Sequence, residues 1–121
     1  MLTSQDVGVF GEGLAAEFLC RRGLVILDRR WRPSGKCVKG ELDVVARDGN
    51  DLVIVEVKTR RSLAFGSPAE AITVRKMRTL RSLALAWLDE HAIHATNVRF
   101  DVVAVIIPPV GRPVIEYLRG V

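Results

Sequence analysis

Three charged residues stand where this sequence otherwise predicts buried strands: Asp43, Glu56 and Lys58. In the segment Asp51–Arg61, DLVIVEVKTRR, the last two interrupt a run of β-branched residues typical of a central strand. Because strand side chains alternate, Glu56 and Lys58 point to the same face. Burying unpaired charge is costly, so carboxylates that persist inside a protein usually hold a metal ion or take part in chemistry.

The turn signal DGN at residues 48–50 predicts a hairpin of two strands, 41–47 and 52–59. In this hairpin the charged positions of the two strands lie on one face, and Glu41 shares that face with Asp43. Three carboxylates and one ammonium group are thereby gathered in a small area. The alternative is a set of cross-strand ion pairs on a solvated face, and the apolar residues of both strands argue against it.

The chemistry that such a set supports is metal-assisted hydrolysis of a phosphodiester. Carboxylate oxygens at short range suit a hard divalent cation, Mg²⁺ or Mn²⁺, which needs few protein ligands. Such an ion polarises a phosphodiester oxygen and lowers the pKa of a coordinated water. Lys58 would orient that water, help to deprotonate it, or stabilise the charge that builds on the phosphate.

The elements that position these residues follow from apolar periodicity and turn signals. The expected order is a helix, three strands, a helix, a strand and a short last strand at an edge, at residues 4–22, 24–31, 41–47, 52–59, 73–91, 97–107 and 114–118. A short additional helix is expected to begin at Ser67, and Arg99 and Asp101 are expected to form an internal ion pair. This order predicts one α/β domain over residues 1–121.

Composition and charge limit the class of protein. The chain has 121 residues, 49% of them hydrophobic, which is enough for one core. No signal-peptide pattern, bilayer-length apolar run or disulfide framework is visible, so we expect a cytoplasmic protein that does not associate with a membrane. The net charge of +4, with 14 Arg and 4 Lys, suits a nucleic-acid partner and equally an ordinary basic surface.

Longer motifs extend along nearly the whole chain. They are G-E-x-L-A at 11–15, RRWR at 29–32, GELDVVARDG at 40–49, VIVEVKTRR at 53–61, FGSPAEAIT at 65–73 and RFDVV at 99–103. Together they resemble the YraN family of small bacterial endonuclease-like proteins, and the spacing of Asp43 from Glu56-Val57-Lys58 resembles the D…(D/E)xK motif of restriction-endonuclease-like nucleases. The resemblance implies a restriction-endonuclease-like mixed β-sheet flanked by helices, in the order αβββαβ plus a short last strand, as in archaeal Holliday junction resolvases.

The resemblance also implies roles for individual residues. It makes Asp43 and Glu56 catalytic metal ligands, with the backbone carbonyl of Val57 as a further ligand, and it makes Lys58 the catalytic lysine. The implied activity is an endonuclease that uses Mg²⁺ or Mn²⁺ to hydrolyse phosphodiester bonds in DNA, including branched or structured DNA. The choice between DNA and RNA stays open.

A further carboxylate of the site is expected on the first helix. Reasoning from the residues alone leaves Glu12 and Glu17 open, because a helical Glu is by default a solvated side chain. The resemblance favours Glu12, eleven residues before Gly23, as a catalytic residue and metal ligand. Glu41 matches the GE(I/L)D signature of the family and is expected to support the site.

Basic residues near these carboxylates are candidates for phosphate contacts. Arg60 and Arg61 lie two and three residues after Lys58 and are the better candidates; Arg75 and Lys76 on the second helix are further ones, although a charged outer helix face is the commoner explanation. Two alternatives to a nuclease remain: a nucleic-acid-binding module of the same fold with little or no cleavage, and a structural protein whose strands pair in a homodimer.

Overall fold

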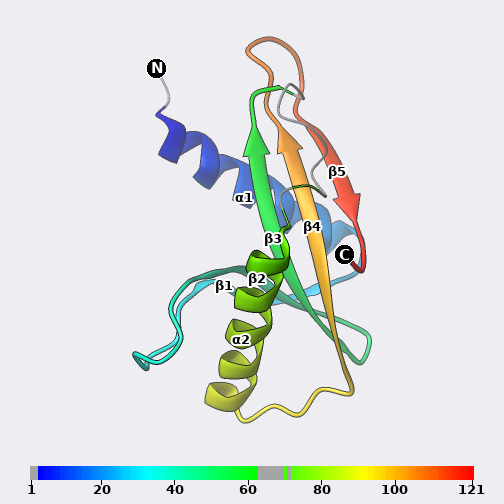
Figure 1. Cartoon of the computed structure of the whole chain (residues 1–121). Coiled ribbons are helices and arrows are strands. Elements are labelled where there is room, and N and C mark those ends of the chain that lie inside the picture. Colours follow the sequence, from blue (N-terminus) through cyan, green and yellow to red (C-terminus); the bar gives the residue numbers. More distant parts are fainter. Residues whose placement is uncertain (1–2, 63–69, 71) are drawn as a thin grey trace.

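The chain folds into a five-stranded sheet with one helix on each face (Figure 1). The computed structural model describes residues 3–62, 70 and 72–121. The elements are α1 (Ser4–Arg21), β1 (Val25–Trp31), β2 (Leu42–Asp48), β3 (Asp51–Arg60), α2 (Val74–His91), β4 (Asn97–Ile106) and β5 (Val114–Leu118). The predicted α/β class and element order are confirmed, and each bound lies within one residue of its expected position. The start of the short helix expected at Ser67 lies outside the described residues.

The sheet is mixed and follows the chain, in the order β1-β2-β3-β4-β5. Neighbouring strands are antiparallel except for β3 and β4, which run parallel. Parallel neighbours need a long crossover connection, and α2 provides it. Strand β5 lies at an edge, as predicted, and β3 lies at the centre of the sheet.

Both helices begin at threonine caps that the sequence supplies. The side chain of Thr3 accepts a hydrogen bond from the backbone of Asp6, whose carboxylate accepts one from the backbone of Thr3. Thr73 caps α2 in the same way by accepting from the N–H of Lys76. These caps satisfy helix N–H groups that have no partner within the helix, and they set where each helix starts.

The sheet separates two apolar cores. Helix α1 packs against the first core, whose buried members are Ala15, Leu19, Leu24, Val44, Ala46, Val53, Val55, Val57, Val103 and Val105. Helix α2 packs against the second, formed by Leu42, Val45, Leu52, Ile54, Leu80, Leu83, Ala84 and Trp87. The central strand β3 contributes to both cores, which explains its nearly continuous apolar sequence. Neither helix of the described residues is both long and apolar enough to cross a bilayer.

The predicted ion pair between Arg99 and Asp101 is confirmed. Nε of Arg99 lies 3.0 Å from Oδ1 of Asp101, whose carboxylate also accepts from the hydroxyl of Tyr117 at 2.5 Å and from the N–H of Gly120 at 2.9 Å. The Asp101 side chain is fully buried, so these donors compensate the loss of its hydration. Burial and the hydrogen bond to Asp101 raise the pKa of Tyr117 to about 12. This network supports the fold.

Candidate metal and nucleic-acid site

The site forms where β2 separates from β3. The paired residues of the two strands run from Asp48↔Asp51 to Val44↔Val55, while β3 continues beside β4 as far as Arg60. Just beyond the last β2–β3 pair, the N–H of Val57 donates to Oδ2 of Asp43 over 2.8 Å. The Asp43 carboxylate is therefore held in the opening between the strands by a backbone group.

Three carboxylates converge at this opening. Glu12 from α1, Glu41 from the segment before β2 and Asp43 from β2 each place one carboxylate oxygen within 4.8 Å of the others. We call these three residues the acidic cluster. All three are partly buried, and donors of this kind at this spacing suit Mg²⁺ or Mn²⁺. Glu41 was expected to support the site, and here it is one of the three candidate ligands.

Gly11 brings Glu12 to the acidic cluster. A Cβ atom at position 11 would lie 2.1 Å from Oγ1 and 2.9 Å from Cβ of Thr59, so only glycine allows α1 to cross β3 this closely. By contrast, a Cβ atom at Gly13 would meet nothing within 4 Å. Gly11 lowers the helix propensity of α1, but its close approach to Thr59 is what positions the neighbouring Glu12.

Glu56 approaches the acidic cluster from β3. It is only 6% exposed and lies close enough to Asp43 for the two carboxyl groups to interact. Burial, hydrogen bonding with Glu56 and the nearby charge of Glu56 raise the pKa of Asp43 well above its ordinary value of 3.8. The site therefore holds more carboxylate charge than its surroundings stabilise.

One carboxylate oxygen of Glu56 is buried without a hydrogen bond among the described residues. Oε2 is buried and makes no hydrogen bond of acceptable geometry to the described residues, although Nζ of Lys76 lies 3.0 Å away as an ion-pair partner. A buried carboxylate oxygen without a hydrogen bond is unfavourable unless a cation compensates it. Lys76 supplies such a cation here, so the donor set that fits a hard divalent cation consists of Glu12, Glu41 and Asp43, with Glu56 beside Asp43.

Basic side chains surround the carboxylates. Nε of Arg30 lies 2.6 Å from Oε2 of Glu12, and Nε of Arg32 lies 3.0 Å from Oε2 of Glu41. Reasoning from the sequence assigned these two arginines no role, although both belong to the RRWR segment. Lys76, a candidate for phosphate contact, has Nζ 3.0 Å from Oε2 of Glu56.

The structure also separates the two candidate carboxylates of α1. Glu12 lies in the acidic cluster, whereas Glu17 is exposed and pairs with Arg21 one helical turn away. The two residues are five positions apart and so project from different sides of the helix. Geometry favours Glu12, as the resemblance implied.

Lys58 lies two residues beyond Glu56 on β3, on the same face of the strand. It is half-buried, and within the described part of the chain it forms no hydrogen bond or ion pair. Its ammonium group is therefore unpaired among the described residues and projects from the same face of β3 as Glu56. The backbone carbonyl of Val57 remains a predicted ligand.

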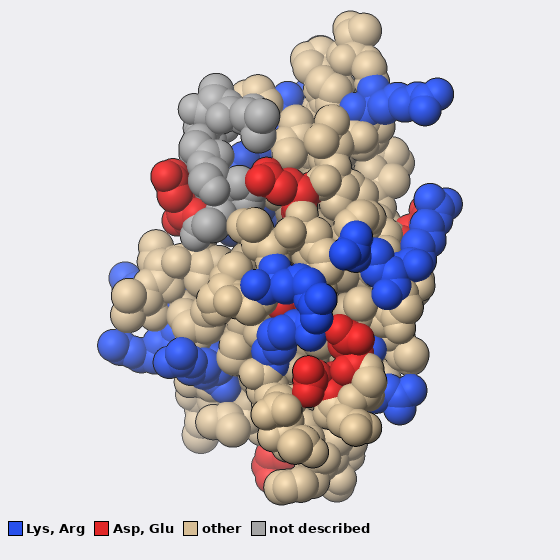
Figure 2. Space-filling model, turned by 90° about the vertical axis from the view of Figure 1, so that its right-hand side faces the viewer, with Lys and Arg blue, Asp and Glu red and all other residues tan. Residues whose placement is uncertain are grey.

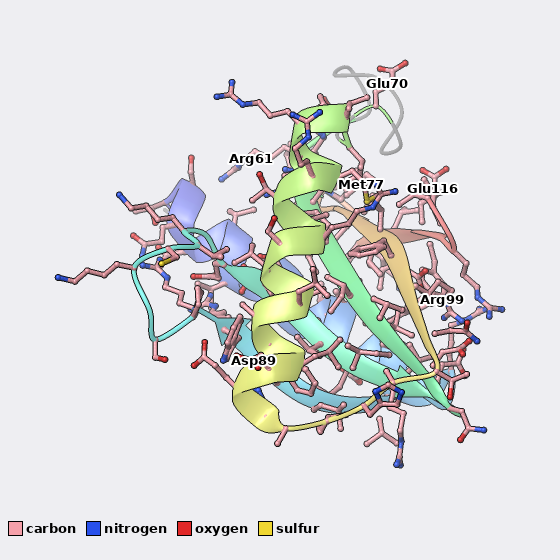
Figure 3. The ribbon with its side chains drawn as sticks, turned by 60° about the horizontal axis from the view of Figure 1, so that its bottom comes forward. Arg61, Glu70, Met77, Asp89, Arg99 and Glu116 are labelled. Atoms are coloured by element: carbon pink, nitrogen blue, oxygen red, sulfur yellow. The ribbon has the colours of Figure 1, made fainter. Side chains whose placement is uncertain are left out.

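The basic residues that follow Lys58 line a hollow. Arg60 and Arg61 form it together with Thr59 and three residues at the start of α1, and its volume is about 260 Å³. Arg75 is exposed on α2. Figure 3 labels Arg61 and Arg99, which lie at opposite ends of the sheet region in that view. On the face in Figure 2, basic side chains form separate groups interspersed with acidic ones.

A mixed sheet with one helix on each face, and acidic residues where two central strands separate, define an α/β protein of the restriction-endonuclease-like class. The chain belongs to the uncharacterised protein family UPF0102, whose model matches residues 11–105; this is the YraN family, so the resemblance is confirmed. It is 51% identical over 121 residues to a UPF0102 protein of Beutenbergia cavernae, covering 100% of this chain and 99% of the relative.

Other relatives match equally well. A UPF0102 protein of Renibacterium salmoninarum is 51% identical over 120 residues, covering 99% of this chain and 98% of the relative. One of Acidothermus cellulolyticus is 52% identical over 126 residues, covering 96% and 92%. The names of these relatives give the family and state no activity.

Proposed function

We propose that this protein is a metal-dependent nuclease that hydrolyses phosphodiester bonds in DNA, with branched or structured DNA as the first substrates to test. The observation that carries the proposal is the convergence of Glu12, Glu41 and Asp43 within 4.8 Å of one another, beside the buried Glu56. Carboxylates at this spacing repel one another unless positive charge lies between them. A divalent cation would supply that charge.

The residues divide the work by their positions. Glu12, Glu41 and Asp43 would hold Mg²⁺ or Mn²⁺, with Glu56 beside them. When bound, the cation supplies positive charge that polarises the phosphodiester and acidifies water. Lys58, half-buried and without a partner in the described part of the chain, is placed to orient water or to stabilise negative charge on the phosphate.

The hollow at the end of β3 suggests how the substrate approaches. Arg60 and Arg61 line it and are two and three residues beyond Lys58 on the same segment. Guanidinium groups match phosphate geometry, so a nucleic-acid backbone that passes this hollow would lead a neighbouring phosphate toward Lys58. Binding would then weaken as salt rises, because phosphate contacts release counterions.

A second function has an observation of its own. Glu12, Glu41 and Glu56 each have a basic partner within the chain, at 2.6, 3.0 and 3.0 Å. Such internal pairing partly compensates the carboxylates without a metal. It therefore favours, as the alternative, a nucleic-acid-binding module of the same fold that cleaves little or nothing.

The test is incubation with linear, flap and four-way-junction DNA, and the matching RNA, in Mg²⁺ or Mn²⁺. We expect cleavage that chelation abolishes and that Asp43→Asn lowers by roughly a hundredfold or more. Salt-sensitive binding of the same substrates without cleavage by the wild type would select the binding module. If the protein neither binds nor cleaves any of these substrates, both proposed functions lose their support.

A further inference from the structure

Arg30 occupies an unusual place in β1. The pairs Arg29↔Val44 and Trp31↔Leu42 put it across from Asp43, after an irregularity in the register of β1. Its φ is +50°, a left-handed conformation that residues other than glycine rarely adopt. Strained backbone of this kind persists only where the surroundings impose it, and it is more frequent at functional sites.

The side chain of Arg30 lies against the acidic cluster. Its Nε is 2.6 Å from Oε2 of Glu12, a shorter distance than the 3.0 Å between Nε of Arg32 and Oε2 of Glu41. The hydrogen bond and charge of Glu12 raise the pKa of Arg30, with smaller contributions from Glu41 and Asp43. The guanidinium group therefore pairs with Glu12 and lies within the electrostatic reach of Glu41 and Asp43.

Arg30 is also free to move away. Its side chain is 45% exposed, whereas that of its partner Glu12 is 19% exposed. A long side chain at the open side of a site has room to swing into solvent, while the carboxylate stays between α1 and the sheet. In this pair Glu12 is the fixed partner and Arg30 is the partner that can be displaced.

We propose that Arg30 is the resident counter-ion of the acidic cluster, and that a divalent cation displaces its guanidinium group from Glu12 on binding. The inference rests on the metal-dependent function proposed above. It makes Arg30 a regulator of metal affinity: without metal, Arg30 compensates the crowded carboxylates, and it competes with the cation for Glu12. Its fixed positive charge opposes that of the cation, so Arg30 sets how much free metal the protein needs.

The test is calorimetric titration of the metal-free full chain with Mn²⁺. Arg30→Asn removes the charge and keeps a residue that tolerates positive φ, and Arg30→Gln is a second neutral variant in case the first folds poorly. Both should bind Mn²⁺ more tightly, by roughly threefold to tenfold, since the site is partly solvated. Arg30→Lys keeps the charge and should bind nearly as the wild type does.

Arg29→Asn is the matched control. Arg29 is the exposed neighbour on the same strand, so this change removes an equal charge away from Glu12 and should leave the affinity unchanged. A second measurement follows from mass action: at equal Mn²⁺, melting temperature should rise more in Arg30→Asn than in the wild type.

The outcomes separate this inference from the proposed function. Equal or weaker Mn²⁺ binding by both neutral variants, beside a wild type that binds, overturns the inference alone and makes Arg30 a residue that positions Glu12. Binding by the neutral variants but not by the wild type supports it in its strongest form. If no variant and no wild type binds Mn²⁺, the metal-dependent function fails and the inference fails with it.

Discussion

Oδ2 of Asp43 accepts a hydrogen bond from the backbone N–H of Val57 over 2.8 Å, just beyond the last paired residues of β2 and β3. Beyond this point β2 no longer pairs with β3, so the Asp43 carboxylate accepts the hydrogen bond that a backbone carbonyl would otherwise accept. This contact fixes the position of the carboxylate. The same geometry brings Asp43 to Glu56, its neighbour across the opening. The following predictions depend on this arrangement and on the contacts that surround it.

The two carboxylates of α1 should differ in metal binding. Glu12→Gln removes a charged oxygen from the acidic cluster and should weaken Mn²⁺ binding by about tenfold or more. Glu17→Gln, the matched control on the same helix, removes an exposed partner of Arg21 and should leave the affinity unchanged. Titration calorimetry of both variants is the measurement, and equal effects of the two changes would contradict the assignment of Glu12.

Lys58→Met should separate metal binding from catalysis. The change removes no carboxylate ligand and takes away a nearby positive charge, so the Mn²⁺ affinity should hold or increase. Cleavage should drop by roughly a hundredfold or more, the scale of losing one contact in the transition state. Metal titration and the cleavage assay are run on the same preparation. Unchanged cleavage removes Lys58 from the mechanism, and lost metal binding gives it a role in the fold.

The stability of the metal-free protein should fall as pH rises. Burial and Glu56 raise the folded-state pKa of Asp43 above 3.8, so the folded state binds the proton more tightly than the unfolded state does. The resulting stabilisation is fully present below the unfolded pKa and is lost as pH rises through the folded pKa. The charged groups near the Asp43 carboxyl group are Glu56 and Glu12, and Arg30 is paired with Glu12.

Asp43→Asn isolates this contribution, because its amide oxygen still accepts from Val57 but does not titrate. With chelator present, the variant should exceed the wild type in stability at about pH 8.5 by on the order of 1 to 2 kcal/mol, and the gain should shrink toward about pH 5. Urea unfolding at both pH values measures it. Parallel pH profiles of the two proteins would show that Asp43 carries no such shift.

Two glycine substitutions in α1 should have opposite effects. Gly11→Ala places a Cβ atom against Thr59 and should lower the free energy of unfolding by about 1 to 3 kcal/mol, with weaker Mn²⁺ binding because Glu12 moves with the helix. Gly13→Ala meets open space and should stabilise the protein by about 0.5 to 1 kcal/mol through helix propensity.

Urea unfolding compares the two glycine variants. Thr59→Ala in the Gly11→Ala background removes the two closest atoms and should restore part of the stability. If Gly11→Ala behaves like Gly13→Ala, the close crossing of α1 over β3 does not seat Glu12.

Much of the fold could be predicted from the sequence because its signals are local. Threonine caps, alternating apolar residues and the DGN turn act over a few positions, and the elements they predicted lie within one residue of those observed. The turn also sets the strand register, which is why Asp43 and Glu56 were expected to meet. That expectation needed only the pairing of two neighbouring strands.

The partners of the site carboxylates depended on contacts between distant segments. Periodicity alone leaves Glu12 and Glu17 open, and the choice follows from the crossing of α1 over β3 at Gly11. The partners of Glu12 and Glu56 come from β1 and α2, eighteen and twenty positions away along the chain. By itself the sequence determined the elements, the strand register and the presence of the carboxylates. Only tertiary packing decided which charges meet, because a side chain's neighbours across the sheet depend on how whole elements are placed.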